Sequence, residues 1–255
     1  MTSRFRAALI GTVTTGLFFT GTAAVVAKSP EERRQIQTAD RVAEQFDAAL
    51  RRHVSTAADA VQQQHDADQD GYPALLKVAS KGVSTAPRIS TEGTTAYGRE
   101  HSSKYATAGA RRAATLAALD GLEKYLRLKA IPDSKFIAAG KKLAGLQPGK
   151  LLGDTPIFSG APLRELVLPA FRKARTRLKK QPVPRGADLL RLDLTTYADD
   201  AVAMTEKGAD KIDEGQPFFF RLGDRPAALM RRLTEYEAGI QAQTQKQVES
   251  VVAAP

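Results

Sequence analysis

The sequence predicts an all-α protein, and three features indicate this fold class. Alanine supplies 42 of the 255 residues, β-branched residues are scattered rather than clustered, and apolar residues recur at intervals of three and four over several long segments. Alanine is the best helix former, and the 3–4 spacing places apolar side chains on one face of a helix. We therefore expect a single bundle of about four long helices with a partly helical crossover.

The chain opens with a hydrophobic targeting segment. Arg4 and Arg6 precede residues 7–27, which carry no charge. A short basic start before an apolar run is typical of a secretory leader, and the run is long enough to span a bilayer. Residues 1–27 are thus predicted to be either a cleaved signal peptide or a membrane anchor. The helical domain, residues 28–255, would then be extracytoplasmic, either secreted or tethered to the cytoplasmic membrane.

Membrane orientation has an alternative. Several cations follow the apolar run closely, and the positive-inside rule, applied strictly, would keep the domain in the cytoplasm. Long domains are translocated largely regardless of their charge, so export remains the favoured prediction.

The first helix of the domain is predicted over residues 31–64. Ser29 and Glu32 flank Pro30 in the pattern of a capping box, which satisfies the free amides at a helix start. Apolar residues at 3–4 spacing then continue to about Gln64. This stripe predicts one long amphipathic helix.

The segment after the first helix is expected to connect rather than to pack. Residues 65–99 are rich in Asp, Gly, Pro, Ser and Thr, with one short helix predicted over residues 73–80 and ended by Gly82. A second long helix is predicted over residues 100–129, because Pro132 disfavours a helical residue before it.

Residues 130–181 are predicted to form the crossover. It contains a shorter helix after Asp133 and another at about 162–180, which should be kinked or begin anew at Pro169. The Pro-rich stretch 181–186 is the place where a boundary between two smaller domains would fall.

Two more long helices complete the predicted bundle, at residues 187–214 and 225–248. Both carry an apolar stripe at 3–4 spacing, and Asp224 can cap the second. The glutamine-rich end of the last helix, residues 241–247, is expected to fray. The aromatic run 218–220 is predicted to close the bundle end as part of the core.

Short motifs give little support for catalysis. The chain has no cysteine, which excludes disulfides and thiolate chemistry, and its three histidines, His53, His65 and His101, belong to no zinc-protease motif. No nucleophile elbow or Gly-rich phosphate loop occurs either. The sequence therefore favours a non-enzymatic envelope protein, with an enzyme of unrecognised site as the alternative.

One acidic loop is a candidate calcium site, which makes a calcium-dependent binding module a further alternative function. Asp66, Asp68, Asp70 and the glycine after them resemble the first half of an EF-hand loop, in which Tyr72 would add its carbonyl oxygen. The bidentate acid expected at the twelfth position is Lys77 instead, so calcium would bind weakly. A solvated polar turn is the competing interpretation.

The middle of the chain is strongly basic. The formal net charge is +10, and residues 131–192 carry 13 basic and 4 acidic side chains, whereas residues 193–255 carry 7 and 11. One helix concentrates this charge and predicts binding to anionic lipid, an envelope polyanion or a protein partner. Its proposed contact residues are Arg172, Lys173, Arg175, Arg177, Lys179 and Lys180.

Two observations restrict what this basic helix is expected to bind. The following helix, 187–214, is acidic and could neutralise it in a hairpin. Aromatic residues are not interleaved with the cations, and this argues against nucleic acid as the partner.

Overall fold

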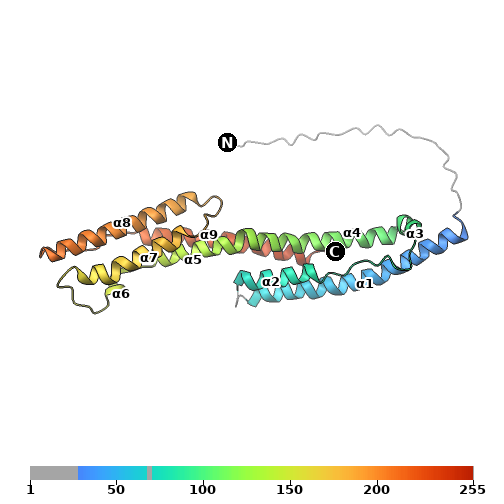
Figure 1. Cartoon of the computed structure of the whole chain (residues 1–255), viewed down its shortest axis with the longest axis horizontal. Helices are drawn as coiled ribbons and strands as arrows, with labels where there is room; N and C mark the ends of the chain where they lie inside the picture. The colour runs from blue at the N-terminus through green and yellow to red at the C-terminus, as the bar shows by residue number, and fades with distance from the viewer. Residues whose placement is uncertain (1–27, 68–70, 255) are drawn as a thin grey trace, which may run out of the picture.

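The computed structural model describes residues 28–67 and 71–254, and these form an elongated all-α bundle (Figure 1). The described residues contain no strand, so the predicted fold class is confirmed. The predicted leader, residues 1–27, lies outside them. Among the described helices, none combines the length and the apolar character needed to cross a membrane. The helices are α1 (Pro30–Ala67), α2 (Gly71–Ser84), α3 (Ala96–His101), α4 (Ser103–Tyr125), α5 (Ile131–Ala144), α6 (Pro148–Leu152), α7 (Leu168–Lys179), α8 (Asp188–Asp213) and α9 (Arg225–Val252), with π-helical turns η1 (Leu126–Ala130) and η2 (Leu163–Val167).

The bundle has two ends that α9 joins. Helices α1, α2, α3 and α4 make up one end and α6, α7 and α8 the other, while α9 runs along both α5 and α4 (Figure 1). One hydrophobic core extends from Val61 in α1 through Leu122 and Phe136 to Tyr197 in α8. A second, smaller cluster around Phe46 packs α1 on α4.

The start of α1 follows the predicted capping box. The Glu32 amide donates to Ser29 Oγ (3.1 Å), and the Ser29 amide donates to Glu32 Oε2 (2.6 Å). The helix continues to Ala67, three residues beyond its predicted end, so that Asp66 is helical. Its buried stripe is the one that the 3–4 pattern predicts, and includes Ala39, Leu50 and Val61.

The expectation that residues 65–99 only connect is wrong. Helix α2 packs against both α1 and α4, and buries Leu75, Ala79 and Gly82. Gly82 does not end this helix but lies inside it, where an added Cβ would stand 3.2 Å from Leu119 Cδ2. Glycine lets α2 lie close to Leu119 of α4 here, and the local sequence pattern does not reveal this contact.

The predicted break at Pro132 is also wrong. Residues 103–144 form one helical path, roughly 60 Å long at about 1.5 Å per residue. In η1 the Ile131 amide donates to the carbonyl oxygen of Leu126, five residues earlier. This wider turn rearranges the hydrogen bonds that proline would otherwise disrupt. The same device precedes Pro169, where the Leu168 amide donates to the carbonyl oxygen of Leu163 in η2.

The last helix is longer and better ordered than its composition predicts. Helix α9 continues to Val252, and Thr244, Val248 and Val251 are buried where α9 packs on α1 and α4. The expectation that residues 241–247 fray is therefore wrong, because tertiary packing holds them. The aromatic run agrees only partly with its prediction, since Phe218 and Phe220 pack on the core while Phe219 is exposed.

Candidate functional site

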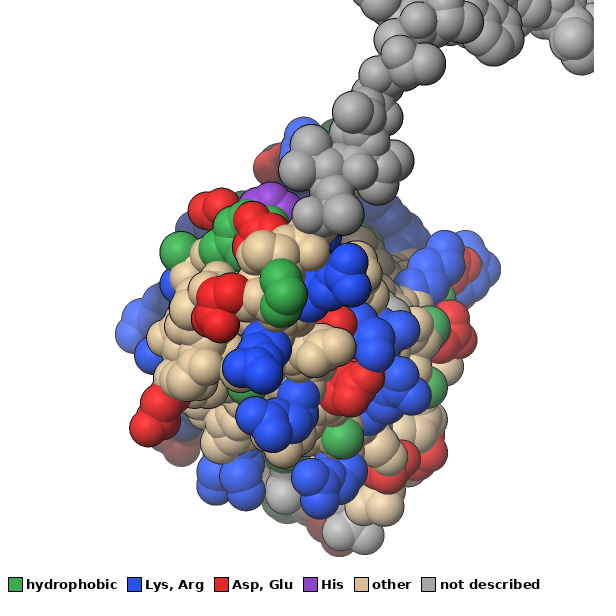
Figure 2. Space-filling view, turned by 90° about the vertical axis from the view of Figure 1, so that its right-hand side faces the viewer, with side chains coloured by type: hydrophobic (Ala, Val, Ile, Leu, Met, Phe, Trp, Pro, Cys, Tyr) green, Lys and Arg blue, Asp and Glu red, His purple; other side chains and the backbone are tan. Residues whose placement is uncertain are grey.

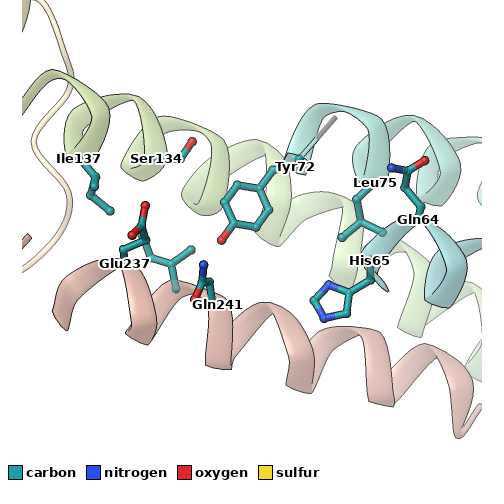
Figure 3. A pocket seen from close by; sticks show the side chains of 10 residues that line it. Gln64, His65, Tyr72, Leu75, Ser134, Ile137, Glu237 and Gln241 are labelled. Carbon is teal, nitrogen blue, oxygen red and sulfur yellow. The ribbon is translucent and has the colours of Figure 1, made fainter. Parts of the chain in front are cut away.

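A pocket of about 460 Å³ lies where four helices meet (Figure 3). Its walls come from the end of α1, the start of α2, the first turns of α5 and the middle of α9. Leu75, Ile137 and Ile240 are buried and give it an apolar floor. The polar lining consists of Gln64, His65, Tyr72, Ser134, Glu237 and Gln241.

Helical periodicity explains how each wall presents several groups. Ser134 and Ile137 lie one turn apart on α5, and Glu237, Ile240 and Gln241 lie one turn apart on α9. On the other side, the chain reverses between α1 and α2, so that His65 and Tyr72 face the same space. No sequence motif marks the pocket, because its residues come from four distant segments.

The pocket's hydrogen-bonding groups are only partly engaged. Lys141 Nζ lies 2.5 Å from Glu237 Oε2, so the carboxylate is matched by a cation. Ser134 Oγ donates to the carbonyl oxygen of Ile131 (2.9 Å). Within the described part of the chain, the side chains of Gln64, His65 and Gln241 make no hydrogen bond. These groups remain available to a ligand.

A partly buried polar network holds α5 against α9 beside the pocket. Asp133 is 4% exposed, and its Oδ2 accepts from Lys129 Nζ (2.9 Å) and Tyr236 Oη (3.3 Å). Tyr125 Oη donates to the carbonyl oxygen of Ile240 (3.1 Å). Burial raises the pKa of Tyr236, and the negative charge of Asp133 raises it further. The network fixes the spacing of two pocket walls.

The predicted calcium ligands are only partly within the described residues. Asp66 is exposed in the last turn of α1, where its Oδ1 accepts from Gln62 Nε2 (2.8 Å). Asp68 and Asp70 lie outside the described residues. Tyr72 stands in the first turn of α2, and its side chain lines the pocket. No group of three or more acidic, His or Cys side chains suited to a metal occurs in residues 28–67 and 71–254.

The two remaining histidines contact backbone carbonyls. His53 Nε2 lies 3.0 Å from the carbonyl oxygen of Gly82, and His101 Nδ1 lies 2.9 Å from that of Tyr97. The His101 ring also stacks on Tyr97, with centroids 4.0 Å apart. Both imidazoles therefore serve contacts between or within helices.

The predicted basic surface divides into a paired and an unpaired part. Helix α8 supplies carboxylates to Arg172, which lies 2.5 Å from Glu206, and to Arg175, which lies 2.5 Å from Asp199. Arg164, ahead of α7, pairs with Asp210 and Asp213 (2.6 Å each). The other four cations are exposed and form no ion pair with any described residue: Lys173, Arg177, Lys179 and Lys180.

Sequence reasoning missed an apolar surface at the α6 end. Phe158 is 92% exposed and, with Ile157, borders an open hollow of about 570 Å³. The hollow lies between the segment after α6 and the end of α8, and its wall includes Leu163 and Phe218. In the sequence, the adjacent apolar residues Ile157 and Phe158 within an irregular segment could have indicated this surface.

The fold and these surfaces define a helical-bundle protein with a polar pocket between four helices and a group of unpaired cations at the end of α7. Comparison with known proteins identifies no relative of this architecture. No family model matches the chain, and neither curated proteins nor solved structures match it. Function must therefore be inferred from the chain's own residues.

Proposed function

We propose that this protein is an exported or membrane-anchored, non-enzymatic protein of the cell envelope that binds a phosphate-rich anionic surface. The observation that carries the proposal is the charge balance of the α7–α8 hairpin. The acidic face of α8 neutralises Arg164, Arg172 and Arg175 and leaves the end of α7 unmatched. We refer to Lys173, Arg177, Lys179 and Lys180 as the α7 patch.

The α7 patch has the geometry of a docking surface. Lys173, Arg177 and Lys180 follow one another at helical spacing, so their charges share one side of α7. Each cation close to an anionic membrane surface contributes about 1 kcal/mol, and these three would contribute roughly 3 kcal/mol, or more than a hundredfold in affinity. Such binding weakens as salt screens the charges.

The position of the α1 start is compatible with a tether. In Figure 1 α1 starts at the end of the bundle away from α6, so an anchor in residues 7–27 would hold the bundle by that end. Figure 2 views this end, where Lys and Arg are interspersed with Asp and Glu rather than gathered alone. The α7 patch is favoured as the anion-binding surface because its cations lack such partners.

A charge-matched comparison tests the proposal. Fluorescently labelled polyphosphate would be titrated with the full chain in a non-ionic detergent, at low and high salt. The test variant replaces the α7 patch by glutamine. The control variant replaces Arg41, Lys77, Lys81 and Lys246, which are exposed and in no ion pair with a described residue. It removes the same charge from other surfaces.

We expect the wild type and the control variant to bind with a strong salt dependence, and the α7-patch variant to lose most of its affinity. An equal loss of affinity in both variants would mean that binding depends only on net charge, which would contradict a specific role of the α7 patch. Unchanged binding in the α7-patch variant would overturn the proposal and leave a protein partner as the alternative.

Calcium binding at Asp66, Asp68 and Asp70 stays a second proposal. Gly71 has φ +61°, the left-handed conformation that an EF-hand-like turn needs at its glycine. A ligand that binds only the folded state raises the melting temperature. Millimolar calcium should therefore raise the melting temperature of the full chain but not that of Asp68→Ala. An equal response in the two proteins would count against this site.

A further inference from the structure

We propose that the pocket between α1, α2, α5 and α9 binds a neutral, hydroxyl-rich small molecule of about one or two sugar rings. This site lies on different elements from the α7 patch and does not depend on it. Its volume of about 460 Å³ falls in the range of ~300–1,000 Å³ that small-molecule sites occupy.

The unengaged polar groups of the pocket are suited to hydroxyl groups. Gln64 and His65 line the pocket from α1, and Gln241 lines it from α9 (Figure 3). An amide both donates and accepts hydrogen bonds, and a hydroxyl does the same. A ligand with several hydroxyls can therefore satisfy groups that protein contacts leave open.

The charge of the pocket favours a neutral ligand. Among the described lining residues, Glu237 alone is an Asp, Glu, Lys or Arg, and Lys141 neutralises it at 2.5 Å. An anion would meet the Glu237 carboxylate, and a cation would have to compete with Lys141 for it. A neutral molecule disturbs neither partner.

The floor and walls supply shape. Leu75, Ile137 and Ile240 are only 2%, 1% and 3% exposed, so they close the inner side of the pocket with tightly packed apolar side chains. The Asp133 network and the Tyr125 hydrogen bond to Ile240 hold α5 and α9 in place without a ligand. A site built in advance avoids part of the entropy cost of binding.

Saturation-transfer NMR on the full chain tests the site, in a detergent that contains no sugar. The neutral probes are glucose and maltose, and the charged probes are glucosamine and glucose 6-phosphate. The test variant is Gln64→Ala with Gln241→Ala. The matched control is Gln63→Ala with Gln243→Ala, two exposed glutamines on the same helices that do not line the pocket.

We expect saturation transfer to a neutral probe, unchanged in the control variant and weakened by about tenfold or more in affinity in the test variant, because two hydrogen-bonding amides are lost. Far-UV circular dichroism checks that both variants remain helical. Absence of transfer to both neutral probes, stronger binding of a charged probe, or equal binding by the two variants would overturn the inference.

Discussion

Gly160 lies directly against the backbone of Ala209. A Cβ atom at position 160 would stand 2.4 Å from the carbonyl oxygen of Ala209 and 2.8 Å from its Cα. The Gly160 amide also donates to Asp213 Oδ1 (2.7 Å). These contacts fasten the segment after α6 to α8, and they need a residue without a side chain.

Gly160→Ala is therefore expected to lower the free energy of unfolding by about 1–3 kcal/mol, the usual cost of overpacking. Urea unfolding followed by circular dichroism measures it. Gly149→Ala is the control, because nothing lies within 4 Å of a Cβ atom at position 149. Equal unfolding midpoints for the two variants would contradict the close contact.

The hydroxyl of Tyr197 offers a substitution expected to stabilise the protein. Tyr197 is 1% exposed, and its hydroxyl has no hydrogen-bond partner among the described residues. Tyr197→Phe removes this desolvated group and keeps the edge-to-face contact with Phe171, at 6.4 Å between centroids. We expect a gain of about 1 kcal/mol in the free energy of unfolding.

Tyr125→Phe gives the opposite case. Its hydroxyl donates to the carbonyl oxygen of Ile240, so this variant should lose about 1 kcal/mol. The same loss in Tyr197→Phe would mean that the Tyr197 hydroxyl has a partner after all.

Acid sensitivity should depend on Asp47. Its carboxylate accepts from Arg111 on α4 (2.7 Å) and Arg51 on α1, and the Arg111 hydrogen bond holds the pKa of Asp47 below its ordinary value. A carboxyl group with a lowered folded-state pKa stabilises the fold above its unfolded pKa, and this contribution is lost as the pH falls through the folded pKa.

Between about pH 5 and pH 2, the melting temperature of the wild type should consequently fall more than that of Asp47→Asn. Scanning calorimetry across this range measures the difference. Asp154→Asn changes an exposed carboxyl that pairs with no described residue, and it should follow the wild type. If the melting temperatures of Asp47→Asn and the wild type fell in parallel with pH, the Arg111–Asp47 pair would not contribute to stability.

Export should require the first 27 residues. A reporter enzyme that is active only outside the cytoplasm, fused after Pro255, is expected to be active with residues 1–27 and inactive without them, because the basic start and apolar run are predicted to be the export signal. Recovery of the fusion in membranes indicates a retained anchor, and release into the medium indicates cleavage. Activity of the shortened fusion would contradict the predicted leader.

Several features of the fold follow from sequence alone, because they depend on neighbouring residues. The capping box at Ser29 and Glu32 fixes the start of α1 through hydrogen bonds three residues apart. The 3–4 apolar pattern likewise predicts α8 to within a residue at each end. In these two cases the determining residues are close in sequence, and local chemistry is sufficient for the prediction.

Contacts between distant segments decided the rest. Helix α2 packs because α1 and α4 cover it, and the end of α9 stays helical because Val248 is buried. The continuous path through Pro132 is different, because a local π-helical turn accommodates the proline. Arg172 is neutralised and Lys173 is not, since only one of these neighbours points at α8. The polar pocket also depends on tertiary structure. No single segment of the sequence contains its lining residues, and they come together only where four helices meet.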